Sequence, residues 1–480
     1  MTLPLSALSD DEMRTIKQLE MRHDAELPEL EAYDRYYEGT QPFTYMQPEI
    51  LARVGDRIRP VIVFWPQLIV GSRDERLDVE GFRLPDESDA DDELWRIWQA
   101  NDLDEGSSMA HVDALVMRRS YICIGSNEED RDTPLITVES PLEIYADIDP
   151  RRRRVRSALR RVMEVDPAGG VGQRFATLYL PNETIWCEEV GGGWKPIARD
   201  RHNVGEVLVE PLVNRQRLRS ASVTPTNLTV ERLGRSELDA VIPLVNAVDK
   251  LATDMMVAAE FVAIPLRALF GVGADSFKDK DGNSQAILDA VMGKMLTIPD
   301  ENVKAFEFAA AQLQNFGAGI KELSQMLSAV GAVPPDYLGH STHNPASAEA
   351  GRVAETRLIK RCERIQRGFG GSWERAMRKA MRVATGSWDD DLKRLETIWR
   401  DPSTPTVAAA ADAAVKKFTA NIVPKRQTRE DLGYTSAQIE RMEEEDEKDA
   451  EKSPSGRLLD IARAGADRPV TDAGIGNPAA

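Results

Sequence analysis

The amino-acid sequence predicts an α+β fold that is mainly helical and contains one β-rich subdomain. Apolar residues recur at helical spacing before residue 120 and again after residue 236. Between residues 135 and 213 the pattern changes to short apolar runs separated by glycine and proline turns. A chain of 480 residues also exceeds the size at which one hydrophobic core keeps growing, so several subdomains are expected.

The charge balance limits the classes of function. The chain has 61 basic and 80 acidic residues and a net charge of −19, which argues against a protein that grips nucleic acid by neutralising its phosphates. The longest apolar stretch contains charged residues such as Asp249 and Arg267, so no membrane span is predicted. No secretory signal is expected at the amino terminus. The three cysteines are odd in number and widely separated, which predicts buried, reduced thiols.

The first helix is predicted over residues 9–38. Ser9 and Glu12 have the spacing of a capping box at its start, and Pro28 is expected to break it. A second helix is expected over residues 48–70, with kinks or breaks at Pro60 and Pro66. Shorter elements then follow, namely helices over residues 93–99 and 109–119 and a strand over residues 121–124.

The β-rich subdomain carries an arginine cluster between two of its expected strands. Strands are predicted over residues 135–138, 142–145, 158–165, 175–180 and 184–188. The cluster consists of Arg151, Arg152, Arg153, Arg154, Arg156, Arg160 and Arg161. We interpret it as a rim that pairs with acidic neighbours, and contact with DNA phosphates remains the alternative.

A long helix is predicted over residues 236–270, with Ser236 as its N-cap and Pro265 near its end. A compact insertion follows over residues 271–306, with a short helix over 285–293 and a strand over 295–298. The next helix carries apolar residues at alternating steps of three and four, a narrow seam suited to packing against other helices. The seam consists of Leu313, Phe316, Ile320, Leu323, Leu327 and Val330.

Residues 331–346 are expected to form a loop that ends at the longest helix of the chain. Asn344 and Pro345 supply an N-cap and a first-turn proline for that helix, which is expected to end near Thr385. Its apolar face is formed by Ala354, Leu358, Cys362 or Ile365, Phe369, Trp373, Met377 and Met381. Beyond it we expect a linker over 387–402, helices over 406–417 and 436–447, and a disordered tail over 451–480.

No motif for catalysis, a cofactor or a metal is predicted. Residues 234–238 begin like a nucleophile elbow but lack the closing glycine, and Ser236 is better explained as a helix cap. His340 and His343 provide too few ligands for a metal site. The sequence therefore predicts a protein that is not an enzyme.

Three local segments resemble the portal proteins of tailed bacteriophages, in particular those of long-tailed phages that infect actinobacteria. Residues 76–82 (RLDVEGF) are similar to the early RLxVxGF segment of that family, and residues 234–238 (GRSEL) to the GxSxL segment that opens its stem helix. Residues 334–339 (PPDYLG), followed by 344–349 (NPASAE), are similar to its tunnel-loop region and to the start of its longest helix. The resemblance covers about residues 30–440 and extends to the order of elements.

The resemblance implies a portal fold with a β-rich wing, two stem helices, a small clip, a tunnel loop and a helical crown. The wing would comprise residues 1–235 and 347–400, the stem helices 236–270 and 307–330, the clip 271–306, the tunnel loop 331–346 and the crown 401–450. The tunnel loop would place near DNA the residues Pro334, Pro335, Asp336, Gly339, His340, Ser341, Thr342, His343 and Asn344. The clip residues singled out are Lys278, Lys280, Asp281 and Asn283, and the apolar seam would lie between subunits.

The implied function is structural. A homo-oligomeric ring, usually a dodecamer in the family, would sit at one capsid vertex and pass double-stranded DNA during packaging and ejection. Implied partners are further copies of the chain, the DNA, the large terminase subunit, head-completion or adaptor proteins, and the major capsid and scaffolding proteins, without a membrane. The implied location is the virion, and the host cytoplasm during assembly. The runner-up is another capsid-associated protein, a scaffold or head-completion protein, and a cytoplasmic hydrolase comes third.

Overall fold

The computed structural model confirms the α+β class. The residues that it describes are 7–42, 60–84, 90–127, 129–130, 132–165, 172–216, 221–223, 229–231, 234–263, 267–270, 295–298, 313–339, 348–403, 407–434 and 436–452. The chain divides into two compact units, Met1–Pro402 and Ser403–Ala480, and each is described by itself.

Helix α1 (Asp10–Glu38) begins at the predicted capping box. The Ser9 hydroxyl accepts a hydrogen bond from the Glu12 amide at 3.3 Å, and the Glu12 carboxylate accepts from the Ser9 amide at 2.8 Å. The expected break at Pro28 is wrong, because the helix continues through it. Leu19 and Leu30 are buried on either side of Pro28 in two different core clusters, and this packing offsets the backbone hydrogen bond that proline cannot make.

The second predicted helix begins later than expected. Helix α3 spans Trp65–Asp74, residues 60–64 are not helical, and the earlier residues 43–59 lie outside the described part. Pro66 lies in the first turn of α3 instead of kinking a longer helix, a position where its missing amide has no intrahelical partner to lose. Two further helices and a strand follow, α4 (Asp92–Ala100), α5 (Leu103–Met117) and β2 (Arg119–Gly125).

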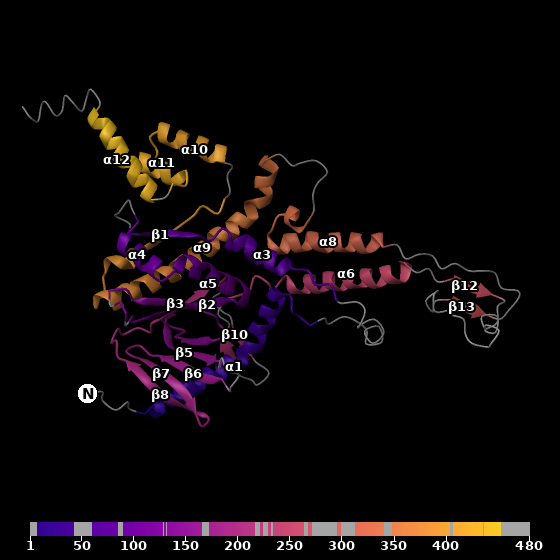
Figure 1. The fold of residues 1–480 in the computed structure, drawn as a ribbon, viewed down its shortest axis with the longest axis horizontal. Coiled ribbons are helices and arrows are strands. Elements are labelled where there is room, and N and C mark those ends of the chain that lie inside the picture. Colours follow the sequence, from indigo (N-terminus) through magenta and orange to yellow (C-terminus); the bar gives the residue numbers. More distant parts are fainter. Residues whose placement is uncertain are drawn as a thin grey trace, which may run out of the picture. The chain divides into compact units, whose positions relative to one another are not determined.

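Two antiparallel sheets form the β-rich part, and α1 packs across the larger one (Figure 1). The three-stranded sheet has the order β3-β2-β9, with β3 at Leu135–Glu139 and β9 at Val209–Val213. The five-stranded sheet is a meander of β4 (Ile144–Ile148), β5 (Val155–Glu164), β6 (Gln173–Tyr179), β7 (Thr184–Val190) and β8 (Gly193–Asp200). All five predicted strands of this part are confirmed within a few residues, while β8 and β9 were not predicted individually. A short pair, β10 (Ala221–Val223) and β11 (Thr229–Glu231), precedes the helical half.

A small sheet joins distant parts of the chain. Strand β1 (Val79–Arg83) pairs antiparallel with β14 (Glu396–Trp399), which follows a short 3-10 helix, η3 (Asp391–Arg394). The expectation that residues 387–402 form a plain linker is therefore wrong. Leu392 and Leu395 are buried in the main core, and this burial fixes the segment against the rest of the unit.

The main core is built around the longest helix, α9 (Ala348–Thr385), which ends where predicted. Phe369, Trp373 and Met377 are buried on its predicted apolar face. The Trp373 ring lies edge-on to Trp98 with 4.8 Å between ring centroids, and its indole N–H donates to His111 Nε2 at 3.0 Å. This aromatic cluster anchors α9 to α4 and α5. The cysteines Cys123, Cys187 and Cys362 are free and buried, as predicted.

The helical half of the first unit contains two further long helices. Helix α6 spans Ile242–Ala263 and α8 spans Gln314–Gly331. The predicted start of the first helix at residue 236 is wrong, and Ser236 is not its N-cap, because the Ser236 hydroxyl accepts a hydrogen bond from the Leu238 amide at 3.0 Å before the helix begins. Residues 267–270, expected to end the first of these helices, instead form strand β12 (Arg267–Phe270), which pairs in parallel with β13 (Met295–Ile298). The strand over 295–298 is thus confirmed, and the short helix expected over 285–293 lies outside the described residues.

The described residues of the second unit form three helices. They are α10 (Val407–Thr419), α11 (Lys425–Asp431) and α12 (Ser436–Lys452). The first and last were predicted, and α11 was not. Ion pairs from Arg426 to Glu443 (3.1 Å) and from Arg429 to Asp446 (2.6 Å) join α11 to α12. Most of the tail expected over 451–480 lies outside the described residues.

Candidate functional site

Helices α6 and α8 lie side by side as an antiparallel hairpin (Figure 1). Gly319 of α8 faces Leu251 of α6 so closely that a Cβ atom on this glycine would lie 3.3 Å from the leucine side chain. Glycine in the middle of a helix usually lowers its stability, and here it permits the close approach of two helices. At the base of the hairpin, Asp249 of α6 accepts hydrogen bonds from the Val63 amide (2.9 Å) and from Gln41 (3.1 Å).

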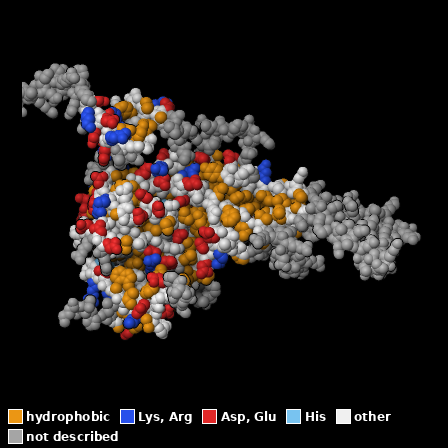
Figure 2. All heavy atoms as spheres, viewed as in Figure 1, with side chains coloured by type: hydrophobic (Ala, Val, Ile, Leu, Met, Phe, Trp, Pro, Cys, Tyr) orange, Lys and Arg blue, Asp and Glu red, His pale blue; other side chains and the backbone are white. Residues whose placement is uncertain are grey.

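The hairpin leaves apolar side chains on its surface. Met256 of α6 and Met326 and Val330 of α8 have 49%, 48% and 41% of their surface exposed, and Figure 2 shows hydrophobic side chains gathered over this region. Of the predicted seam, Leu327 is fully buried and Val330 is exposed, and the other four members are half-buried, namely Leu313, Phe316, Ile320 and Leu323. An apolar surface of this kind on a two-helix arm indicates contact with another surface.

The segment after α8 turns sharply and is fixed at its start. Ala332 adopts a left-handed conformation (φ 56°), and Val333 and Leu338 are buried with Leu327 in one cluster. The predicted loop residues divide between described and undescribed parts. Pro335 and Asp336 belong to a 3-10 helix, η2 (Pro335–Leu338), after Pro334, and Gly339 follows it with a positive φ of 82°. The remaining predicted residues, His340, Ser341, Thr342, His343 and Asn344, lie outside the described part.

A buried carboxylate links four parts of the first unit. Glu237, just before α6, has an oxygen 3.2 Å from Arg73 Nε of α3 and 3.2 Å from Arg361 Nη2 of α9. Its other oxygen accepts from Asn214 at 3.1 Å and lies 3.8 Å from Arg215 Nε. Burial alone would raise the pKa of this carboxyl, but the three guanidinium groups hold the pKa below its ordinary value.

The same two arginines hold the end of α8. The Gly331 carbonyl accepts hydrogen bonds from Arg73 and from Arg361 Nη1, the latter at 3.0 Å. This carbonyl belongs to the last turn of the helix, where backbone oxygens lack intrahelical partners and attract cations. Glu237 therefore connects the start of α6, the end of α8, helix α3 and helix α9 through one network.

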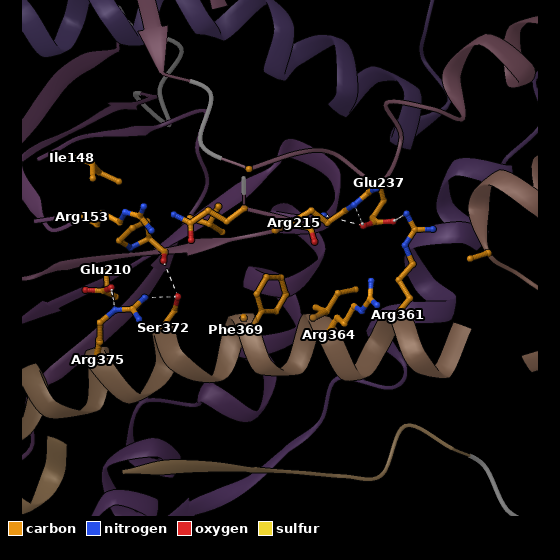
Figure 3. A pocket seen from close by; sticks show the side chains of 18 of the residues that line it. Ile148, Arg153, Glu210, Arg215, Glu237, Arg361, Arg364, Phe369, Ser372 and Arg375 are labelled. Carbon is orange, nitrogen blue, oxygen red and sulfur yellow. Dashed lines mark hydrogen bonds and ion pairs between the residues drawn. The ribbon is translucent and has the colours of Figure 1, made fainter. Parts of the chain in front are cut away.

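A basic cleft opens beside this network (Figure 3). It has a volume of about 1770 Å³ and lies between α9, the end of α8, strand β9 and the turn between β4 and β5. Arg361, Arg364, Phe369 and Arg375 rise from the same side of α9 in Figure 3, opposite Arg215 and the turn that bears Arg153.

The members of the arginine cluster over residues 151–161 differ in whether they contact acidic residues. Arg160 pairs with Glu139 at 2.7 Å and Arg161 with Asp24 at 2.6 Å, and two more members reach acidic residues at longer distances. Of these two, Arg154 lies 3.5 Å from the Glu206 carboxylate and Arg156 lies 3.6 Å from the Asp147 carboxylate. The predicted pairing with acidic neighbours is thus confirmed within the chain for these four, and contact with DNA or another subunit stays a prediction for the others.

Other predicted positions give no described site. The clip residues Lys278, Lys280, Asp281 and Asn283 lie outside the described part. Within the described residues, no group of three or more His, Cys, Asp or Glu side chains could hold a metal ion. Nor is any described helix both long and apolar enough to cross a membrane.

Sequence reasoning missed the Glu237 network and the basic cleft. A signal for the cleft exists, because Arg357, Lys360, Arg361 and Arg364 recur at steps of three and one along a helix and must share a face. The Glu237 network has no comparable signal, since Arg73, Arg215 and Arg361 are separated by more than a hundred residues each.

Comparison with known proteins gives similarity over nearly the whole chain. The family described as "Phage portal protein, SPP1 Gp6-like" matches residues 16–452. The portal protein of Mycobacterium phage D29 is 39% identical over 398 residues, covering 81% of this chain and 79% of that protein. The portal protein of Mycobacterium phage L5 is 38% identical over 412 residues, covering 84% of this chain and 80% of that protein.

Proposed function

Because the chain belongs to the phage portal protein family, we propose that it forms a closed ring of identical subunits around a DNA channel at one vertex of the capsid. The family is structural, and its role is in DNA packaging. Membership also favours a portal over the alternative of a scaffold or head-completion protein. The ring would hold twelve subunits, each of 53.4 kDa.

The observation that carries this proposal is the apolar surface of the α6–α8 hairpin. Half-buried Phe316, Ile320 and Leu323 and exposed Met326 lie on one helix of a two-helix arm. In a ring with cyclic symmetry each subunit presents two different faces to its two neighbours, so a hairpin can be covered from both sides. We assign α6 and α8 to the stem and the seam residues to the contact between subunits.

We assign the other parts of the chain to the regions of the portal fold in the same way. Residues 271–306 would form the clip, with Lys278, Lys280, Asp281 and Asn283 facing the large terminase subunit and later the head-completion or adaptor proteins. Residues 1–235 and 347–400 would form the wing, which faces the major capsid and scaffolding proteins. Residues 401–450 would form the crown. Assembly would take place in the host cytoplasm before the ring enters the virion.

The segment over residues 331–346 would form the tunnel loop around the DNA. It contains no Lys or Arg and one acid, Asp336, and few phosphate contacts mean weak binding that lets a duplex slide. Its start is fixed, because Arg73 and Arg361 hold the Gly331 carbonyl and Leu338 is buried. The residues proposed to contact the DNA would therefore lie after Gly339.

The proposal is tested by the mass and shape of the purified protein. Native mass spectrometry should give a closed ring of roughly 640 kDa for twelve subunits, and electron microscopy should give top views with a central hole. A protein that stays monomeric at micromolar concentration, or that forms open filaments, would contradict the ring.

A further inference from the structure

The basic cleft has an excess of positive charge that is unusual for this chain. Among the described residues, eight Lys or Arg and three Asp or Glu line it, a surplus of five positive charges. The whole chain has a net charge of −19. The remainder of the chain therefore carries −24, and the cleft is a local reversal of the charge found elsewhere on the protein.

The three acids of the cleft are already engaged. Glu237 is surrounded by Arg73, Arg361 and Arg215. Glu210 pairs with Arg375 and with Lys379, the latter at 2.9 Å. The third acid, Asp149, accepts hydrogen bonds from two backbone amides of its own turn at 2.8 and 2.9 Å. Each of the three acids therefore already has hydrogen-bond or ion-pair partners within the chain.

Two arginines of the cleft have no carboxylate of their own. Among the described residues, none places a carboxylate within ion-pair distance of Arg153 or Arg364, and both side chains are exposed. Arg357 donates to the Ala329 carbonyl at 2.6 Å, and no carboxylate in the described part of the chain lies within ion-pair distance of it. Arg153 and Arg364 come from opposite walls of the cleft, the β4–β5 turn and α9 (Figure 3).

Repulsion among the arginines is a second sign that the cleft carries an excess of positive charge. Burial, together with the charges of Arg73, Arg215 and Arg357, lowers the pKa of Arg361 to about 10 despite the opposing effect of Glu237. Burial, Arg154 and Arg375 likewise lower the pKa of Arg378. Positive charges held this close favour an acidic group from outside.

We propose that the cleft receives acidic side chains from a second copy of this chain, the next subunit of the ring. This inference rests on the ring proposed above. Contacts in a cyclic ring are heterologous, so the cleft of one subunit meets a different surface of its neighbour. That surface belongs to the rest of the chain, whose net charge is −24, and an acidic part of it would be complementary to the cleft.

Duplex DNA is the competing occupant, and the structure favours it less. Arg215 and Arg361 lie within ion-pair distance of Glu237, whose negative charge would repel a phosphate at the same place. A ring that passes DNA also gains nothing from a strong phosphate site in each subunit, since every neutralised phosphate slows sliding.

The first test reverses the two unpaired charges. The double variant Arg153→Glu and Arg364→Glu should fold, because neither side chain has an internal carboxylate partner to lose among the described residues, and circular dichroism checks this. Ring formation should then require about tenfold more protein, because like charges meet at every subunit contact. The matched control is Arg367→Glu, also an exposed arginine on α9 but outside the cleft lining, which should assemble at wild-type concentration.

The second test identifies the partner directly and does not depend on weakened assembly. Arg364→Lys keeps the charge and introduces an amine, which a zero-length carbodiimide links only to a carboxylate in contact with it. Rings assembled from a mixture of unlabelled and ¹⁵N-labelled subunits should yield mixed-isotope cross-linked peptides that contain position 364. Duplex binding to the double variant is measured in parallel by gel shift.

The outcomes separate the two proposals. Mixed-isotope cross-links together with specific loss of assembly support the inference. Unchanged assembly of the double variant, or cross-links confined to one chain, would overturn the inference but not the proposed ring. If the double variant then also binds duplex DNA less tightly than the wild type, the cleft is assigned to DNA. A wild-type protein that forms no ring overturns both this inference and the proposed function.

Discussion

Arg361 Nη2 lies 3.2 Å from the Glu237 carboxylate, and the same guanidinium donates to the last carbonyl of α8 at 3.0 Å. One side chain on α9 therefore contacts both Glu237, five positions before α6, and the residue that ends α8. Because Glu237 has only 2% of its surface exposed, these contacts lie where water cannot replace them.

Replacing Glu237 by glutamine should destabilise the first unit. The substitution keeps the size of the side chain but leaves Arg73, Arg215 and Arg361 without a carboxylate in a buried place. The free energy of unfolding should fall by about 3 kcal/mol or more, as when one partner of a buried ion pair is removed. Urea unfolding at fixed protein concentration measures this, and Glu322→Gln, an exposed acid on α8, should change it by less than about 0.5 kcal/mol. Equal effects of the two variants would contradict the role of Glu237.

His111 should make stability depend on pH. Complete burial lowers the pKa of His111 to about 3 in the folded protein, whereas the unfolded chain has the ordinary value near 6.5. The unfolded chain therefore binds the proton first as pH falls, so this contribution is present above pH 6.5 and is lost progressively between pH 6.5 and 3.

The variant His111→Gln should reduce this dependence. Between pH 6 and 4.5 the slope of the unfolding free energy should be lower than in the wild type by up to about 1.4 kcal/mol per pH unit, the contribution of one proton. Glutamine can still accept the hydrogen bond from Trp373, which limits the loss of stability at pH 7. Gln99→Ala, an exposed change that removes no titrating group, should leave the slope unaltered. If the unfolding free energy has the same slope against pH in His111→Gln and in the wild type, His111 is not the source of the pH dependence.

Ile320→Asp should prevent ring formation. Ile320 is half-buried in the isolated chain, and covering it in the ring would leave the new carboxylate without water. Size-exclusion chromatography with light scattering should give a monomer, and circular dichroism should show that the β-rich part remains folded. Gln325→Asp places the same residue at an exposed position of α8 and should still form rings. If Ile320→Asp elutes as a complete ring, the seam does not lie between subunits.

Shortening the tunnel loop should impair DNA handling without affecting assembly. Because Leu338 is buried, a deletion that begins there would also damage the core, so residues 340–343 are the better choice. Rings should form normally, and phage carrying the deletion should package or retain less DNA, measured by quantifying DNA in purified capsids. Normal packaging would remove the support for a DNA contact by this loop.

Replacing the clip should separate docking from folding. Strand β12 at residues 267–270 pairs with β13 at 295–298, so a Gly/Ser linker should replace residues 267–306 as a whole to avoid an unpaired edge. The wing should fold as in the wild type, and binding of the large terminase subunit in a pull-down should be lost. Retained binding would place the docking surface elsewhere.

Local patterns in the sequence predicted most elements correctly. The capping box at Ser9 and Glu12 and the strand over 295–298 depend on neighbouring residues alone, and both are confirmed. Errors arose where distant packing overrides a local preference. Pro28 should break a helix on its own, but α1 continues through it with Leu19 and Leu30 buried on either side.

The residues of the candidate site were harder to predict from the sequence than the helices and strands. The seam on α8 follows from its periodicity, whereas the Glu237 network depends on residues far apart in the chain that only the fold brings together. The strand over 396–399 was missed for the same reason, because its partner lies at residues 79–83. Such pairings leave no periodic signal in either segment.

The pairing of β1 with β14 has a consequence for how the protein is made. At about 5–20 residues per second, the roughly 300 residues between the two strands delay the partner of β1 by about 15–60 s after its own synthesis. Strand β14 also packs on α9, where a Cβ on Gly370 would lie 3.1 Å from the Trp399 indole nitrogen. The first unit can therefore complete its fold only after translation has passed helices α6 and α8. A chain that ends before residue 396 would leave β1 without its partner strand, and an unpaired strand edge favours aggregation.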